Sequence, residues 1–195
     1  AEMAHKPFPS GRAAHGIVDG CLALMQRHNL TADDIDGVLA EVPPLVHQLV
    51  ARPVRDDMTV NYARLCAAYA GACAMLAGTL EVGDFGDEAR RDPQRLALAR
   101  RVEIRANDNP DPNALTPLRV SLRTRAGKTH AMDIADVYGS PANPLSREAH
   151  LAKLRRNCAA AATPLAEAAV ARLIALSDGL ESVADVRQII DATIA

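Results

Sequence analysis

The chain has 195 residues, of which 49% are hydrophobic and 3% aromatic, and its formal net charge is −2. This length fits one domain or slightly more, and the apolar content excludes a disordered chain. The weak negative charge argues against a nucleic-acid-binding protein, which normally presents a basic surface. No run of about 18 or more apolar residues predicts a membrane-spanning helix.

The four cysteines show no C-x-x-C spacing, and each lies among apolar or alanine-rich neighbours. We expect them to be small buried residues of a protein in the reducing cytoplasm. The first residues, Ala1-Glu2-Met3-Ala4, resemble neither a natural start nor a targeting segment. The chain is therefore expected to be part of a longer protein.

The first part of the chain predicts two helices around a strand. Apolar residues at helical spacing predict a helix from Arg12 to about His28, and its Gly16 and Gly20 would allow close packing against a neighbour. Ile35 to Val42 alternates and predicts a strand. Val60 to Ala77 has almost no polar face, which predicts one buried central helix.

The section that follows predicts more strands. Alternating apolar residues predict strands at 102–107 and 118–123, and the turn residues Arg125-Ala126-Gly127 lead into a third strand at 128–137. Shorter helices are expected at 45–51, 93–100, 146–162 and 165–176 and from Ser182 to the C-terminus.

These elements predict an α+β fold, in which a small antiparallel sheet of about four strands is covered on one face by helices. Residues 1–138 would form this domain. A turn-rich linker starts at Gly139, so residues 139–195 are expected to comprise the linker and the C-terminal helices.

Polar, chemically capable side chains are concentrated at residues 6–15, KPFPSGRAAH. Lys6 and Arg12 could bind carboxylates. His15 could transfer protons near neutral pH, and Asp19, one helical turn later, could orient its imidazole. The alternative is a set of solvated residues near a helix start, and the residues alone leave both interpretations open.

Tyr69 lies among small residues of the predicted central helix, and Arg64 lies five residues earlier. A buried phenol must either bond to a carbonyl group or line a cavity. No metal site is predicted, because the six histidines lack the spacing of a zinc-binding helix and no cysteine joins them. The segment Gly83-Asp84-Phe85-Gly86 lacks the spacing and the lysine of a phosphate-binding loop.

Three segments, taken in order, resemble the small domain of the MmgE/PrpD family and span nearly the whole chain. The first is Lys6-Pro7-Phe8-Pro9-Ser10 with Arg12, His15 and Asp19; the second runs from Ala63 through Arg64 and Tyr69 to Gly78; the third is Gly139-Ser140-Pro141-Ala142-Asn143-Pro144-Leu145-Ser146, followed by Lys153.

The resemblance implies a portion of a cofactor-independent lyase that acts on small di- or tricarboxylates, of the 2-methylcitrate dehydratase type. The family's site lies in a cleft between a large helical domain, which is outside this chain, and the smaller lid-like domain. The expected partners are this N-terminal helical domain, the carboxylate substrate and a second copy of the protein. The residues implied are Lys6, His15 and Tyr69 as catalytic groups and Ser10, Arg12 and Arg64 as substrate-binding groups.

The sequence departs from the family pattern at two places. Gly11 stands where members often carry Cys or His, and Leu65-Cys66 replaces the usual Phe-Ser pair. These departures leave a sister activity open, either decarboxylation or epimerisation. A non-catalytic fragment that binds carboxylates or mediates oligomerisation is a further alternative.

Overall fold

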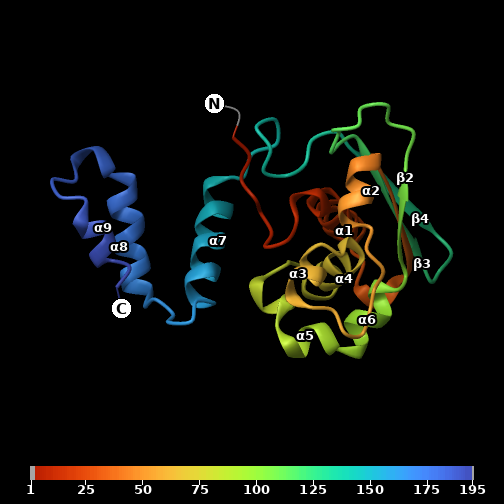
Figure 1. The fold of residues 1–195 in the computed structure, drawn as a ribbon, viewed down its shortest axis with the longest axis horizontal. Coiled ribbons are helices and arrows are strands. Elements are labelled where there is room, and N and C mark those ends of the chain that lie inside the picture. Colours follow the sequence, from red (N-terminus) through yellow and green to blue (C-terminus); the bar gives the residue numbers. More distant parts are fainter. Residues whose placement is uncertain (1–2, 195) are drawn as a thin grey trace. The chain divides into compact units, whose positions relative to one another are not determined.

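The computed structural model describes residues 3–194. The chain divides into two compact units, residues 1–145 and residues 146–195. Figure 1 shows the elements of each unit. The segment from Gly139 to Leu145, predicted as a linker, lies within the first unit.

The first unit is built on a four-stranded sheet with the strand order β2-β1-β3-β4. The β1–β3 and β3–β4 pairs are antiparallel, and the β1–β2 pair is parallel. The chain passes from β1 to β2 through several helices, and a parallel pair requires such a long crossover. The predicted α+β class is confirmed, with one parallel pair in a mostly antiparallel sheet. The strands are β1 (Ile35–Val42), β2 (Val102–Ala106), β3 (Leu118–Thr124) and β4 (Thr129–Ile134).

Helices cover one face of this sheet (Figure 1). Helix α1 (His15–His28) packs against β3 and β4. A Cβ atom at Gly16 would lie 2.5 Å from Leu118 Cδ2, and one at Gly20 would lie 2.7 Å from Val120 Cγ2. The two glycines therefore allow the close approach that their spacing predicts, with the sheet as the neighbour.

The predicted single helix over 60–77 is wrong. The structure has α3 (Val60–Arg64) and α4 (Ala67–Ala77), separated by Leu65 and Cys66. Cys66 has an extended backbone and forms an isolated bridge with Ala51. The interruption also leaves the Arg64 carbonyl free to accept a hydrogen bond from the Gly11 amide, 2.9 Å away. Main-chain contacts with Gly11 and Ala51, which are distant in the sequence, thus replace the hydrogen bonds of a continuous helix.

The remaining helices of the first unit are short. The Asp92 side chain caps α6 by accepting from the Gln94 amide at 2.8 Å, with Pro93 at the first helical position. Three of the four cysteines are buried, as predicted, and Cys158 is half-buried. These helices are α2 (Pro44–Val50), α5 (Asp87–Arg91) and α6 (Pro93–Ala99).

The second unit is helical. Its first helix is capped by Ser146, whose hydroxyl accepts from the Ala149 amide at 3.1 Å. Among the helices that the structure describes, none has the length and apolar character needed to cross a membrane. The helices of this unit are α7 (Arg147–Ala159), α8 (Glu167–Asp178) and α9 (Arg187–Asp191).

Candidate functional site

The three sequence segments that resemble family motifs meet in the first unit. The His5 amide donates to the Gly139 carbonyl at 2.8 Å, and the Gly11 amide donates to the Arg64 carbonyl at 2.9 Å. Gly139 has a φ of +89°, and a Cβ atom there would lie 2.0 Å from the His5 carbonyl oxygen. Only glycine permits this approach. The opening stretch is thus held by main-chain bonds to both of the other segments.

Two of the predicted catalytic groups converge on one carbonyl oxygen. Lys6 Nζ donates to the Ser10 carbonyl at 3.4 Å, and His15 Nε2 lies 3.4 Å from the same oxygen. The Phe8 ring packs edge-on against the His15 imidazole, with centroids 5.5 Å apart. His15 is buried, whereas Lys6 and Arg12 are exposed. A buried imidazole and the exposed cation Lys6 therefore lie at the same carbonyl oxygen.

Two buried polar atoms in this region lack a protein partner. Within residues 3–194, Ser10 Oγ and Arg64 Nε have no hydrogen-bond partner. Ser10 is 5% exposed, and the Arg64 guanidinium lies over the Phe85 ring at 5.8 Å. An unpaired buried polar group costs about 1–3 kcal/mol. Such groups mark places where water or a ligand supplies the missing partner.

Asp19 is a further titratable group one turn after His15 on α1. It is half-buried, and burial raises the pKa of its carboxyl above the ordinary value. Its charge therefore depends on pH over a range closer to neutrality than that of a solvated carboxyl.

Tyr69 takes the first of the two arrangements considered from the sequence. Its hydroxyl donates to the Asp84 carbonyl at 2.7 Å, and the residue is fully buried. Burial raises the pKa of this hydroxyl well above its usual range, so it stays protonated. The Phe85 ring packs against both Tyr69, with centroids 6.1 Å apart, and the Arg64 guanidinium, 5.8 Å away.

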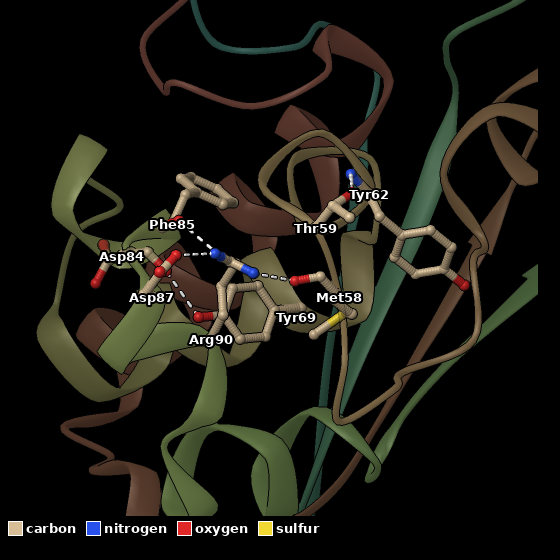
Figure 2. A network of polar contacts seen from close by, with 8 residues as sticks. All are labelled: Met58, Thr59, Tyr62, Tyr69, Asp84, Phe85, Asp87 and Arg90. Carbon is tan, nitrogen blue, oxygen red and sulfur yellow. Dashed lines mark hydrogen bonds and ion pairs between the residues drawn. The ribbon is translucent and has the colours of Figure 1, made fainter.

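Tyr69 lies close to a group of polar contacts that includes Asp84, Phe85 and Arg90 (Figure 2). Arg90 donates to the carbonyls of Phe85 and Met58 and pairs with Asp87. The Asp84 carboxylate, 8% exposed, accepts from Arg95 at 2.5 Å. Sequence reasoning did not find the Asp84–Arg95 pair. The local signal was the Glu81–Asp84 capping box, which predicts a turn but no distant partner.

The two departures from the family pattern lie against each other. A Cβ atom at Gly11 would be 2.6 Å from Leu65 Cδ2. The Leu65 side chain therefore occupies the space that a larger residue at position 11 would need. Gly11 and Leu65 therefore depart from the family pattern together, at the residue that follows Ser10.

The histidines, cysteines and carboxylates of residues 3–194 form no group of three or more that could hold a metal ion. A family model described as the MmgE/PrpD C-terminal domain matches residues 8–178. The match contains Ser10, His15, Arg64 and Tyr69, and Lys6 lies just before it. A search of curated proteins found no match to this chain.

Proposed function

Because this chain belongs to the MmgE/PrpD family, we propose that it is the C-terminal part of a cofactor-independent lyase that acts on small di- or tricarboxylates. The family includes 2-methylcitrate dehydratase-like enzymes, and dehydration is the proposed reaction. The observation that carries the proposal is the convergence of Lys6 and His15 on the Ser10 carbonyl, beside the unpartnered Ser10 and Arg64 atoms.

The arrangement suits a substrate with several carboxylates. Lys6 is an exposed point charge, and Arg12 offers a forked set of donors for a second carboxylate. Ser10 Oγ and Arg64 Nε are donors without a protein acceptor in the part of the chain that the structure describes. A carboxylate bound to either donor would remove the desolvation cost of that donor.

The proposed step breaks a C–H bond next to a carboxylate and a C–O bond on the neighbouring carbon. A C=C bond forms, and the proton and the hydroxide leave as water. Lys6 would stabilise negative charge that develops on the carboxylate as the proton departs. His15 would carry the proton, because an imidazole can both accept and donate one and this ring is held in place by Phe8 and Ser10.

Further groups complete the proposal. The facing wall of the cleft would come from the N-terminal helical domain, and the active form would be a homo-oligomer in the cytoplasm. Tyr69 could act directly only if its hydroxyl left the Asp84 carbonyl, so it enters the proposal chiefly as a residue that packs against Phe85, the ring that Arg64 contacts. The packing of Leu65 against Gly11 supports a second candidate, a decarboxylase or epimerase with a differently shaped pocket.

The test uses the protein together with its helical domain and measures turnover of 2-methylcitrate and a panel of related carboxylates. Lys6→Ala should lower kcat/KM by about 10²–10³-fold, the effect of removing one group that stabilises developing charge. Arg91→Ala, an exposed cation on α5 outside the site, should leave turnover unchanged. Near-normal turnover by Lys6→Ala would refute its role, and a folded protein that turns over no carboxylate would support the non-catalytic alternative.

A further inference from the structure

At the far end of α1, the buried rows of α1 and β4 each give way to a histidine, His28 exposed and His130 half-buried. The buried face of α1 includes Leu24 and Met25 and reaches His28 one turn later. Strand β4 turns Ile134 inward and, at the same alternation, reaches His130. His28 and His130 therefore lie where the core meets solvent, at positions that an apolar residue would ordinarily fill.

The two imidazoles are stacked, with centroids 3.8 Å apart and planes 29° apart. His130 pairs across the sheet with Leu122, which is fully buried, so its side chain lies on the helix-covered face. None of the four ring nitrogens makes a hydrogen bond or ion pair with any residue in the range 3–194. The structure thus brings together two unpartnered imidazoles from two different elements.

Electrostatic repulsion opposes protonation of both His28 and His130 in the absence of an anion. Loss of water contact, together with the charges of His130 and Arg27, lowers the pKa of His28 below its ordinary value. Two protonated rings at this distance repel each other. The position of His28 in the last turn of α1 favours a positive charge, but a second positive charge requires a nearby anion.

The histidines open onto a pocket of about 420 Å³ that is rich in cations. Arg125 Nε donates to the Asp33 carbonyl at 2.8 Å, which fixes the guanidinium, and Lys128 has no ion pair among the described residues. The carboxylate of Asp34 accepts from the amide and hydroxyl of Thr31, both at 2.8 Å. The other lining residues are Leu30, Thr124 and Ala126.

We propose that this pocket binds an oxyanion, with phosphate or the phosphoryl group of a small molecule as the ligand. Arg125 supplies forked donors, Lys128 a point charge, and the two imidazoles N–H groups. The pocket is positive even with both histidines neutral, and a bound anion allows both to be protonated. A metal ion fits less well, because stacking keeps the lone pairs of the two rings in separate, nearly parallel planes, whereas chelation needs them to converge on one point.

This site is distinct from the carboxylate site. His15 is the first residue of α1 and His28 the last, so the length of the helix, about 20 Å, separates them. The proposal does not depend on the proposed dehydratase activity. Binding should strengthen as pH falls, because the anion favours the protonated imidazoles, which face Arg27, Asp34, Arg125 and Lys128.

The experiment titrates inorganic phosphate into the 195-residue chain and follows the imidazole NMR signals of His28 and His130. Both should shift saturably, and phosphate should raise the pH at which they titrate. Lys128→Gln, on an exposed turn, should weaken binding about two- to fivefold, and His28→Gln should weaken it further. Lys153→Gln on α7 is the matched control and should bind like the unmodified chain.

Parallel titrations with ribose 5-phosphate and acetate distinguish the ligand. Equal or tighter binding of the sugar phosphate identifies a phosphorylated molecule, and weaker binding identifies the free ion. Acetate binding as tight as phosphate would overturn the phosphoryl assignment. The proposal also fails if phosphate produces no saturable shift, if Lys128→Gln and Lys153→Gln bind alike, or if Zn²⁺ moves both ring signals and phosphate does not.

Discussion

Two polar regions of the first unit differ in how their buried groups are satisfied. Around Tyr69 and Asp84, the Tyr69 hydroxyl and Arg90 donate to main-chain carbonyls (Figure 2), and the Asp84 carboxylate pairs with Arg95. Around the opening stretch, Ser10 Oγ and Arg64 Nε have no partner within residues 3–194. The regions share Phe85, whose ring lies under Arg64 and whose carbonyl accepts from Arg90.

This difference distinguishes polar groups that stabilise the fold from polar groups that remain free to bind a ligand. A network whose members are partnered stabilises the fold without any ligand. A buried group without a partner lowers stability, and this cost is offset only when another molecule binds. Removing a polar side chain should therefore lower the free energy of unfolding in the first region and leave it unchanged or raise it in the second.

The largest expected effect is on the satisfied network. Asp84→Ala removes the partner of Arg95 and the acceptor for the Glu81 amide, 2.7 Å away. Breaking a buried ion pair costs about 3–5 kcal/mol, and the partial exposure of Arg95 places the expected loss at the lower end. Urea unfolding measures it. Asp56→Ala, which breaks an exposed pair with Arg100, should change stability little; equal losses in both variants would contradict the distinction.

A smaller effect is expected at Tyr69. Tyr69→Phe removes the hydroxyl that donates to the Asp84 carbonyl and should lower the free energy of unfolding by about 1–2 kcal/mol. In the protein with its helical domain, most turnover should remain. A fall in kcat of about 10²-fold or more would instead make Tyr69 a group that transfers a proton.

The smallest expected change in stability, and the most diagnostic, is at Ser10. Ser10→Ala removes an unpartnered hydroxyl, so stability should stay the same or rise by up to about 1 kcal/mol. Carboxylate binding should weaken by about tenfold, the value of one lost hydrogen bond to a charged group. The free energy of unfolding and KM, both measured on this variant, test the two expectations. A clear loss of stability would mean that the hydroxyl has a structural partner.

Much of the local structure could be predicted from the residues because the signals are local. Asn29 ends α1 with a φ of +50°, and Gly78 ends α4 with a φ of +73°. Ser146 caps α7 and Gly127 forms the turn between β3 and β4. Each of these depends on one residue's own backbone preference or on a neighbour within three positions.

Other features depend on partners far away in the sequence. The break at Leu65 and Cys66 is a feature of this kind, because strong helix formers surround it and the bonds that replace the helix come from Gly11 and Ala51. The parallel pairing of β1 with β2 is another, since alternation predicts a strand but not its direction.

The sequence by itself determined the α+β class, most helix and strand positions, and the opening stretch as the place to look for chemistry. Only the tertiary structure decided which of its groups are free to act. Lys6 and His15 meet at the Ser10 carbonyl, and Tyr69 is committed to the Asp84 carbonyl. The physical reason is that a residue type states which hydrogen bonds a side chain can make, whereas packing decides which of them are already made.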